Sequence, residues 1–470
     1  MTIPPWHQLC PLRDDVRSGR LTLDEFAADL NGVRTGEAPE VYRTAALFFE
    51  RTYPTYRMKQ LVRDVLLRLA GQGGKPVQQL QVAYGGGKTH TLITLLHLAE
   101  RGAGLAGQRT VQEFAAFAGL PLLPQARVAL LPFDKFDVKE GMEVYGPGGR
   151  LRRVRTPWGA LAYQLAGDAG YARLKDHDEA FTVPAEPLLV DLLRAPEQER
   201  LGALVLVDEA VWYYRNLVLS DRRFFGALKD FYQVLTQAVA KVPHAALVAA
   251  LIASKVEAAD ATGIECLGAL EDIFKRIAEP VEPVAREDVS EVLRRRLFES
   301  VPGLAERRPV IDAVMASWQQ LPLRDAQRDQ AAYDRLLQSY PFHPDFIEVL
   351  YQKWTQYDQF QRTRGALRLL AQGLRETAGR DPAPLVGVGA LLHPEGPRLS
   401  GALNELITIT GDAGKWGPLL TGELEKAREI QAGLPTLQQR ELEQAVVATF
   451  LHSHPPGQRA APTDLVGLLG

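Results

Sequence analysis

A lysine and a threonine follow three glycines in residues 84–90, which read Tyr-Gly-Gly-Gly-Lys-Thr-His. Glycines let successive backbone N–H groups turn inward around an anion. The start of a following helix points its partial positive charge at the same anion. Lys88 is expected to reach the terminal phosphates of a nucleotide, and the Thr89 hydroxyl to bind Mg²⁺. The predicted phosphate-binding residues are Tyr84, Gly85, Gly86, Gly87, Lys88, Thr89 and His90. One departure is Val82, because the standard pattern has a glycine there.

Two carboxylates end an apolar run in residues 203–209, Ala-Leu-Val-Leu-Val-Asp-Glu. In many ATPases such a strand lies beside the phosphate loop, so that a carboxylate at its carboxyl end meets the metal. Asp208 is expected to hold Mg²⁺ through water, and Glu209 to polarise the attacking water as a general base. An Asp-Glu strand end alone usually just meets solvent. The upstream loop is what points to catalysis here.

Three further side chains are candidates for roles in hydrolysis. Ser254 follows the apolar run 246–253 and can help to place the attacking water. The alternative is an ordinary serine that caps the end of a strand. Arg276 can reach the γ-phosphate of a neighbouring subunit as an arginine finger; the alternative is a solvated cation at a helix end. Arg364 shares a stripe with Arg368 and Arg375 at helical spacing. That stripe fits a phosphate sensor, a nucleic-acid contact or a solvated face.

Residues 144–155 are expected to form a hairpin around Gly-Pro-Gly-Gly, and this segment carries several arginines. The candidate contacts to a nucleic-acid backbone are Arg150, Arg152, Arg153 and Arg155. The alternative is a surface loop whose arginines are solvated or paired with acids. Residues 176–179, Asp-His-Asp-Glu, have metal-binding types, but adjacent residues rarely converge on one ion, so a solvated turn is expected there.

The elements that must position these residues alternate between strand and helix. Short apolar runs at 77–84, 127–132, 203–207, 246–253 and 281–285 predict strands, with helical patterns between them. This alternation predicts an α/β fold with a parallel sheet. Residues 21–66 read helical, with a proline-containing break at 52–55. From about residue 288 the pattern is all-helical, over 290–299, 309–320, 331–339, 345–356 and 365–377.

Four regions follow from these patterns. We expect an N-terminal helical segment at 1–44 and a nucleotide-binding α/β domain at 45–287, with an insertion at 137–200. A helical lid is expected at 288–380. Residues 381–470 are expected to hold a linker at 381–397 and a mixed C-terminal segment, truncated or resembling a winged helix. The tail ends without a clear stop signal, so the chain is expected to be a piece of a longer one.

The amino-acid composition excludes several classes of protein. The 470 residues are 46% hydrophobic and 24% charged with a net charge of −3, which excludes a disordered chain, a collagen and a histone-like basic coat. Cys10 and Cys266 are too few for a disulfide framework and are expected to be plain thiols. No stretch reaches the roughly 18 apolar residues of a membrane helix, and no signal peptide is visible. A cytoplasmic, soluble protein without a membrane partner is expected.

Together these motifs resemble the AAA+ ATPases of the ASCE type, over roughly residues 45–377. Within that class the chain resembles a group of large prokaryotic ATPases, the domain of unknown function 499 family. The matching stretches are 48–53, 84–90, 156–165, 206–209 and 361–365. This group is similar to the phage-growth-limitation Y ATPase of bacteriophage-exclusion (BREX) defence systems.

The resemblance implies an ATPase that uses ATP and Mg²⁺ as a motor or switch in a DNA-modification or anti-phage complex. It implies a homo-oligomer, DNA as a candidate partner, and accompanying proteins such as a DNA methylase or helicase. It also implies that Thr52 and Tyr53 lie near the adenine ring and that Arg364 is the lid sensor. The alternatives are an ATP-gated scaffold with negligible turnover and a replication-initiator-like DNA-binding ATPase.

Overall fold

The computed structural model of the chain describes residues 3–19, 28–81, 86–251, 260–360, 362–437, 439–455 and 460–469. The chain divides into two compact units. Ala28–Ala285 forms the α/β unit, whereas Met1–Ala27 and Arg286–Gly470 form the helical unit. The N-terminal segment expected at 1–44 is therefore shared between the two units.

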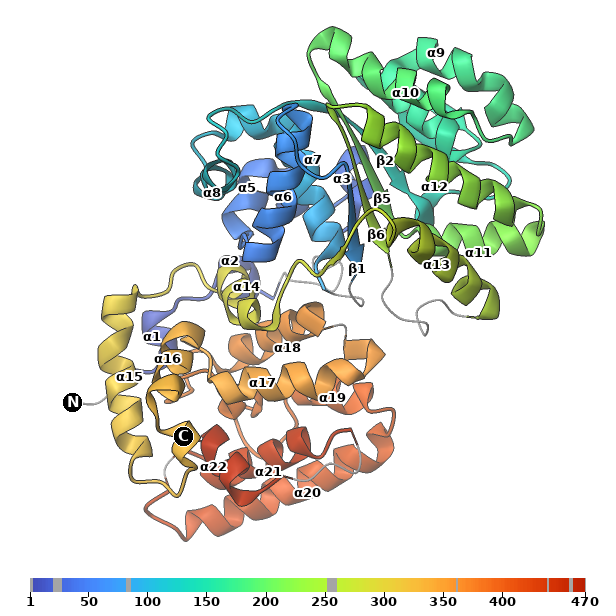
Figure 1. Cartoon of the computed structure of the whole chain (residues 1–470). Coiled ribbons are helices and arrows are strands. Elements are labelled where there is room, and N and C mark those ends of the chain that lie inside the picture. Colours follow the sequence, from blue (N-terminus) through green and yellow to red (C-terminus); the bar gives the residue numbers. More distant parts are fainter. Residues whose placement is uncertain are drawn as a thin grey trace. The chain divides into compact units, whose positions relative to one another are not determined.

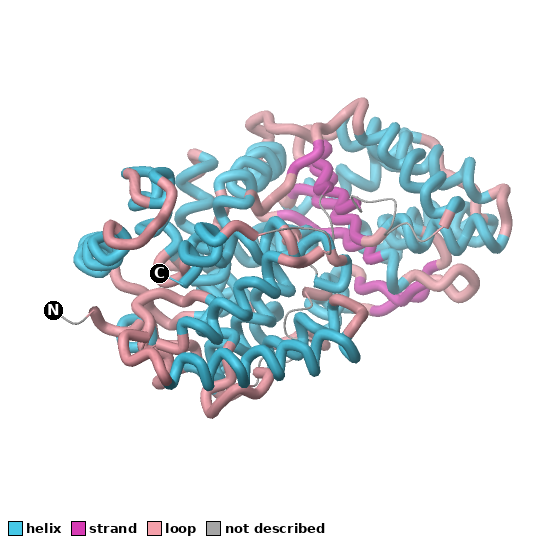
Figure 2. Tube along the Cα trace, turned by 90° about the horizontal axis from the view of Figure 1, so that it is seen from below, coloured by secondary structure: helices cyan, strands magenta, loops and turns pink. Residues whose placement is uncertain are grey.

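A parallel sheet forms the centre of the α/β unit (Figure 1). The described residues give it five strands in the order β2-β5-β6-β1-β7, and these strands lie side by side in Figure 2. The strands are β1 (Val77–Gln81), β2 (Ala126–Pro132), β5 (Gly202–Asp208), β6 (Ala245–Leu251) and β7 (Pro280–Val281). Each lies within or overlaps an apolar run that predicted a strand.

The acid-bearing strand β5 does not pair with β1, the strand that precedes the phosphate loop. Strand β6 pairs with both and lies between them. Apolar runs predict that strands exist, but the order depends on which long-range pairs form. Because all these strands are parallel, their carboxyl ends still meet at one edge of the sheet.

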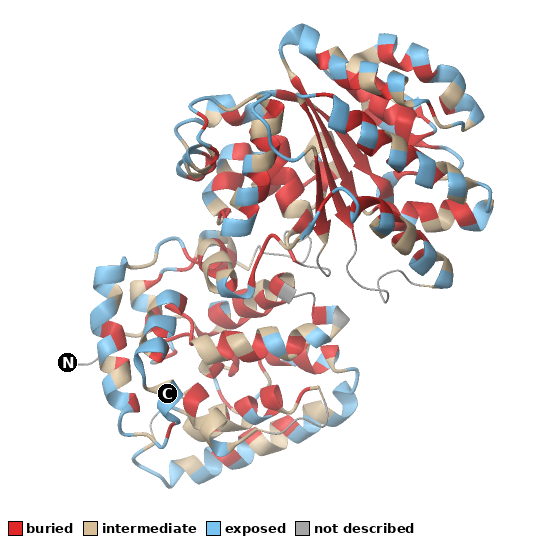
Figure 3. Cartoon of the chain, viewed as in Figure 1, coloured by how far each residue is buried: buried red, intermediate tan, exposed pale blue. Residues whose placement is uncertain are grey.

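Both faces of the sheet are buried, as Figure 3 shows by the red strands. In β5, Leu204 and Leu206 pack into one apolar cluster, whereas Val205 and Val207 pack into the other. This alternation explains why the strands read as continuous apolar runs, as expected for a parallel sheet covered on both faces.

Helices cover the two faces (Figure 1). One cluster contains residues of α3 (Leu30–Thr35), α4 (Glu40–Arg43), α5 (Ala45–Arg51), α6 (Tyr56–Leu69), α7 (Lys88–Arg101) and α8 (Arg109–Ala118). The other contains residues of α9 (Pro157–Ala180), α10 (Glu186–Arg194), α11 (Ala210–Ser220), α12 (Phe224–Lys241) and α13 (Ala261–Phe274). The break expected at 52–55 separates α5 from α6, and the Thr55 hydroxyl accepts from Met58 N at 3.1 Å to begin α6.

The insertion expected at 137–200 lies between β2 and β5. It holds an antiparallel hairpin, β3 (Met142–Tyr145) and β4 (Leu151–Val154), followed by α9 and α10. The Gln164 amide on α9 donates to Leu130 O at 2.8 Å and accepts from Leu130 N at 3.0 Å. This side chain therefore satisfies the backbone of β2, which is an edge strand.

Residues 176–179 are not the solvated turn that we expected. They lie at the end of α9, and Asp178 is buried. Its carboxylate accepts hydrogen bonds from Thr156 N at 2.8 Å, from the Thr156 hydroxyl at 2.6 Å and from the Tyr171 hydroxyl at 3.0 Å. The helix bends at Gly167, so Asp178 reaches back to Thr156 and fastens the two halves of α9 together. The sequence suggested exposure because neighbouring residues are polar, but the helix turns this one inward.

The described part of the helical unit consists of helices, 3₁₀ turns and isolated bridges. Its α-helices are α1 (Trp6–Leu9), α2 (Asp14–Arg17), α14 (Val289–Leu297), α15 (Leu304–Trp318), α16 (Gln330–Ser339), α17 (Pro344–Gln352), α18 (Arg362–Thr377), α19 (Gly401–Ile409), α20 (Ala413–Ala432), α21 (Glu441–His452) and α22 (Pro462–Leu469). The helices expected between 290 and 377 are present. The described residues after 398 form helices and no strand, so they show no winged-helix fold.

The segment expected as a linker at 381–397 is packed instead. Val386, Val388 and Leu391 are fully buried, and the Asp381 carboxylate accepts a hydrogen bond from the Trp6 indole at 2.9 Å. Proline and glycine suggested an exposed connection, but the apolar residues between them enter the core of the helical unit. Among the described helices, none is long and apolar enough to cross a bilayer.

Candidate nucleotide-binding site

Gly87 and Lys88 form the junction between the predicted phosphate loop and α7. Gly87 precedes the helix with φ +86°, a left-handed conformation that favours glycine. A Cβ there would also lie 3.1 Å from Val284 Cγ2. Lys88, the first residue of α7, is buried with 6% of its surface exposed. The loop therefore needs glycine for both conformation and space, and it carries a buried cation at a helix start.

Thr89 and Asp208 are brought into direct contact. The Thr89 hydroxyl donates a hydrogen bond to Asp208 Oδ2 at 3.0 Å. Asp208 ends β5 and is buried. A hydroxyl and a carboxylate are the oxygen ligands that Mg²⁺ prefers. The donor set at this edge of the sheet therefore fits a magnesium ion that carries a nucleotide.

The electrostatics of Asp208 depend on its neighbours. Burial and, to a smaller extent, the Glu209 carboxylate raise the pKa of its carboxyl to about 7, while the Thr89 hydrogen bond and Lys88 oppose this change. The neutral carboxyl is therefore more populated near neutral pH than it is for an exposed aspartate. A cation at the site favours the charged form, because the main cause of the shift is the cost of burying a negative charge.

Asp134 is a site residue that the sequence interpretation missed. It lies just after β2, whose Pro132 is opposite Asp208 in the sheet, and its charge also raises the pKa of Asp208. Lys135 Nζ lies 2.9 Å from Asp134 Oδ2 and 3.6 Å from Asp29 Oδ2. A carboxylate soon after the predicted strand 127–132 was the signal that could have found it.

Glu209 has an unusual backbone conformation. Its φ of 54° and ψ of 32° are left-handed, and it is the residue that precedes α11. A non-glycine residue in this region is uncommon and strained, and such strain gathers at functional sites. The Glu209 side chain is half-buried next to Asp208. The strained turn therefore holds two neighbouring carboxylates at the end of one strand.

Thr52 and His90 join the break between α5 and α6 to the start of α7. Thr52 Oγ1 lies 2.7 Å from Phe48 O and 3.0 Å from His90 Nε2. The His90 ring lies against Phe48 with a centroid distance of 4.5 Å. Tyr53 is half-buried at the same break. Of the two residues predicted for the adenine end, Thr52 therefore contacts His90 of the predicted phosphate loop.

The other predicted site residues lie away from these contacts or outside the residues that the structure describes. Tyr84, Gly85 and Ser254 are outside the described residues. Arg276 is exposed in the turn after α13 and makes no hydrogen bond or ion pair with the described part of the chain. Arg364 lies on α18 in the helical unit, where it is half-buried.

The rest of the arginine stripe on α18 is partly occupied. Arg368 Nε donates to the Glu405 carboxylate of α19. Burial raises the pKa of Glu405, and the adjacent guanidinium opposes that change. Arg375 is exposed on the last turn of the helix. Arg368 therefore forms an ion pair within the helical unit, which was not among the alternatives expected for this stripe.

The four arginines of the hairpin all contact protein groups. The Arg152 guanidinium lies 2.6 Å from Asp168 and 4.4 Å from the centre of the Tyr171 ring. The partners of the others are Asp168 for Arg150 at 4.0 Å, Glu143 for Arg153 at 3.2 Å and the Glu179 carbonyl for Arg155 at 3.4 Å. These contacts agree with the acid-paired surface loop, and a role in nucleic-acid binding stays a prediction.

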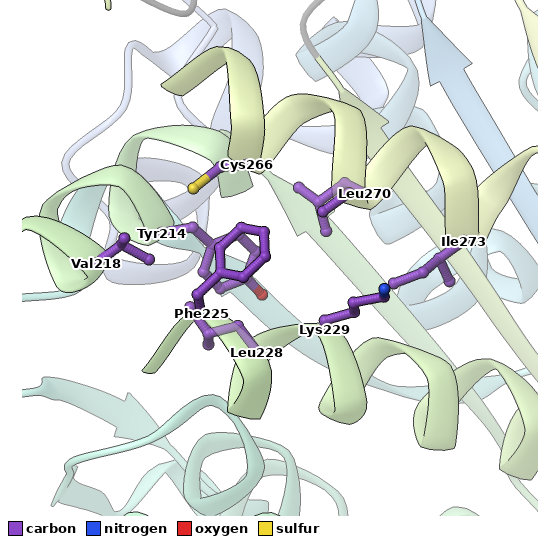
Figure 4. Close-up of a pocket in the computed structure, with 9 residues that line it drawn as sticks. Tyr214, Val218, Phe225, Leu228, Lys229, Cys266, Leu270 and Ile273 are labelled. Atoms are coloured by element: carbon purple, nitrogen blue, oxygen red, sulfur yellow. The ribbon is translucent and has the colours of Figure 1, made fainter. Parts of the chain in front are cut away.

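A small apolar pocket lies between α11, α12 and α13 (Figure 4). The side chains of Tyr214, Leu228 and Cys266 line it, and Lys229 is the charged group of its described lining. Burial raises the pKa of the Cys266 thiol to about 11, so the thiol is neutral at physiological pH. Cys10 is likewise a buried free thiol. Among the described residues, no cluster of His, Cys, Asp or Glu could hold a metal by itself.

Comparison with known families gives two adjoining matches. Residues 7–281 match the DUF499 N-terminal domain, and residues 285–386 match the DUF499 second domain. The chain belongs to the DUF499 family. The border between the two DUF499 domains falls near Ala285, where the α/β unit ends. No curated protein and no solved structure matches the chain. Lys88, Thr89, Asp134, Asp208 and Glu209 therefore lie within the DUF499 N-terminal domain, whereas Arg364 lies within the second domain.

Proposed function

We propose that this DUF499 protein binds Mg-ATP at the start of α7 and hydrolyses it. The observation that carries the proposal is the 3.0 Å hydrogen bond between the Thr89 hydroxyl and Asp208, beside the buried Lys88. Solvent has little access to Lys88 and Asp208, and an anion with a divalent cation would compensate both charges. The parallel sheet, with its loop and acidic pair at one edge, is compatible with a P-loop NTPase.

The residues have separate roles in the proposed reaction. Lys88 and the N-terminus of α7 bind the terminal phosphates. Thr89 and Asp208 hold Mg²⁺, which neutralises charge that develops on the phosphate oxygens. Glu209 accepts the proton of the attacking water and orients it toward the γ-phosphorus. Asp208 is buried, whereas the adjacent Glu209 is half-buried. This difference favours Asp208 as the metal ligand and Glu209 as the base.

The proposal extends to a homo-oligomer in which Arg276 acts across a subunit boundary. An arginine finger must be available to another subunit, and Arg276 is exposed without a partner among the described residues. In trans it stabilises the charge of the transition state. We further propose that the protein is an AAA+ motor or switch in a DNA-modification or anti-phage complex; this part rests on the family resemblance.

An ATP-gated scaffold is the second candidate. It uses the same loop and metal ligands but turns over negligibly. The strained Glu209 favours the enzyme, since a scaffold has no need to keep a general base in a costly conformation.

The first experiment is steady-state ATP hydrolysis with and without duplex DNA, with Lys88→Ala as the blank. Turnover that Lys88→Ala abolishes is expected for the enzyme, and stimulation by DNA would support action on nucleic acid. ATP binding without turnover at any protein concentration would favour the scaffold. A wild-type protein that binds no nucleotide contradicts both.

A further inference from the structure

A cavity of about 620 Å³ lies in the helical unit, between α2, α18 and α19. Helix α18 contacts both of the other helices, so segments far apart in the sequence form its walls. Its size falls within the roughly 300–1,000 Å³ that is typical of pockets for small molecules. The described lining residues all belong to the helical unit. A ligand in this cavity would therefore be bound by that unit.

The lining combines apolar and polar side chains. Val16, Ala371 and Ile409 are buried and form its apolar part. Gln359 and Gln372 add carboxamide groups. Sites for small molecules usually have this composition, in which an apolar surface holds the body of the ligand and a few polar groups orient it.

The charges of the described lining do not balance. Arg368 Nε donates to the Glu405 carboxylate, so these two opposite charges compensate each other. Arg375 also lines the cavity, and it makes no hydrogen bond or ion pair with the part of the chain that the structure describes. The described lining therefore carries one uncompensated positive charge.

The Arg375 guanidinium lies over the backbone of Gly19, another residue of the lining. A Cβ at residue 19 would lie 2.6 Å from Arg375 Nη1, closer than real side chains approach. Gly19 also has φ +68°, a left-handed conformation that favours glycine. The turn after α2 therefore leaves the space that this guanidinium occupies.

The hydrogen-bond donors of the lining indicate the chemistry of a ligand. A guanidinium binds carboxylate or phosphate oxygens through paired N–H groups. Arg368 has further N–H groups beyond the one that Glu405 accepts, and the Gln359 amide has two. This surplus of donors matches a phosphate, which has more anionic oxygens than a carboxylate.

We infer that this cavity binds the phosphate group of a small phosphorylated molecule, with Arg375 as the main charged contact. The inference goes beyond the proposed ATPase, because the cavity uses no residue of the phosphate loop. A nucleic-acid backbone suits it less. Nucleic acids are bound by several cations along a surface, and the described lining offers one uncompensated charge.

The test uses phenyl phosphate, whose binding is followed by NMR of the ligand. The protein carries Lys88→Ala, so that the phosphate loop does not contribute. Adding Arg375→Gln is expected to weaken binding at least about tenfold, as for loss of a hydrogen bond between charged groups. Benzoate, which has the same ring with a carboxylate, is expected to bind more weakly than phenyl phosphate.

A second variant blocks the cavity without touching its arginines. Thr408 is an exposed residue of α19 that lines the cavity, and its hydroxyl donates within its own helix to Asn404 O at 2.8 Å. Thr408→Phe adds a ring at this wall and is expected to abolish binding of phenyl phosphate. Circular dichroism checks that each variant is folded.

Arg398→Gln is the matched control. Arg398 is likewise an exposed arginine of the helical unit that makes no hydrogen bond or ion pair with the described residues, but it does not line the cavity. Its replacement should leave the affinity for phenyl phosphate unchanged. Loss of binding in Arg375→Gln and Thr408→Phe, but not in Arg398→Gln, would support the site.

The opposite results are equally clear. Absence of binding by the Lys88→Ala protein, or unchanged binding after Arg375→Gln, would overturn the site. Benzoate that binds as tightly as phenyl phosphate would overturn phosphate as the ligand group. Duplex DNA that displaces phenyl phosphate, and that itself binds more weakly after Arg375→Gln, would assign the arginine to nucleic acid and overturn the small molecule.

Discussion

The Thr89 hydroxyl and the Asp208 carboxylate lie 3.0 Å apart, although 119 residues separate them in the chain. They belong to different elements, the start of α7 and the end of β5. The parallel sheet brings both to its carboxyl edge. Strand β6 lies between β5 and β1, the strand that precedes α7 in the chain. This contact joins the phosphate loop to the acidic pair and is the basis of the predictions that follow.

Glu209→Gln is expected to leave Mg-ATP binding intact and to lower turnover by at least about a hundredfold, the usual contribution of a general base. The amide has nearly the same shape but cannot accept the proton. Binding is measured by calorimetry and turnover by phosphate release. Glu113→Gln, at an exposed ion pair with Arg109, is the matched control and should keep full activity. Normal turnover of Glu209→Gln would remove Glu209 from the mechanism.

Asp208→Asn tests the raised pKa through stability in the presence of a chelator. The folded pKa of about 7 exceeds the ordinary 3.8, so between these values the folded state binds more protons than the unfolded state. The stability that this one carboxyl contributes is therefore full below about pH 4 and is lost as pH rises to about 7. The asparagine variant lacks this loss.

Relative to wild type, the free energy of unfolding of Asp208→Asn should then be higher by roughly 3 kcal/mol more at pH 8 than at pH 5, since one pKa unit corresponds to ~1.4 kcal/mol. Chemical unfolding at both pH values measures it. Asp191→Asn, at an exposed pair with Arg173, should show no such difference. A wild type and Asp208→Asn with parallel pH profiles would contradict the assigned shift.

Glu209→Gly is expected to raise the free energy of unfolding by about 1 kcal/mol while abolishing turnover. Glycine relieves the left-handed backbone, and removal of the carboxylate relieves repulsion with Asp208. Arg200→Gly relieves a similar φ of 59° on the exposed surface without a catalytic role. It should gain stability and keep activity. Destabilisation by Glu209→Gly would mean that the strain is not stored at this residue.

Arg276→Ala is expected to lower turnover about a thousandfold without weakening ATP binding, as for loss of an arginine finger. Wild-type activity per subunit should rise with protein concentration, and the variant should stay inactive throughout. Lys275→Ala, the neighbour paired with Glu271 at 2.8 Å, is the control. Activity of the wild type that is independent of concentration, with an active Arg276→Ala, would place the charge stabilisation elsewhere.

The hairpin arginines can be separated by their contacts. Arg152→Ala should lower the unfolding temperature, because it loses Asp168 and two aromatic faces, Tyr163 and Tyr171. Arg153→Ala, at an exposed pair with Glu143, should be neutral for stability. If the hairpin binds DNA, Arg153→Ala weakens binding and flattens its dependence on salt. Unchanged binding at low salt would leave the hairpin with a structural role.

The sequence by itself determined the elements and the chemical types at the site. Continuous apolar runs predicted the strands of a sheet buried on both faces, and glycines before Lys88 predicted a sharp turn into a helix. The Asp-Glu pair after an apolar run predicted carboxylates at a strand end. Each of these features depends on residues close together in the chain, so local pattern was enough to predict it.

The tertiary structure alone decided which distant residues meet. It placed β6 between β1 and β5, brought Asp134 near Asp208, and joined His90 to Thr52. It also buried Asp178 and packed the segment at 381–397, which the sequence suggested to be exposed. These outcomes depend on strand order and on the packing of remote helices. Such long-range pairings are set by the fold as a whole, and periodicity in a short window does not report them.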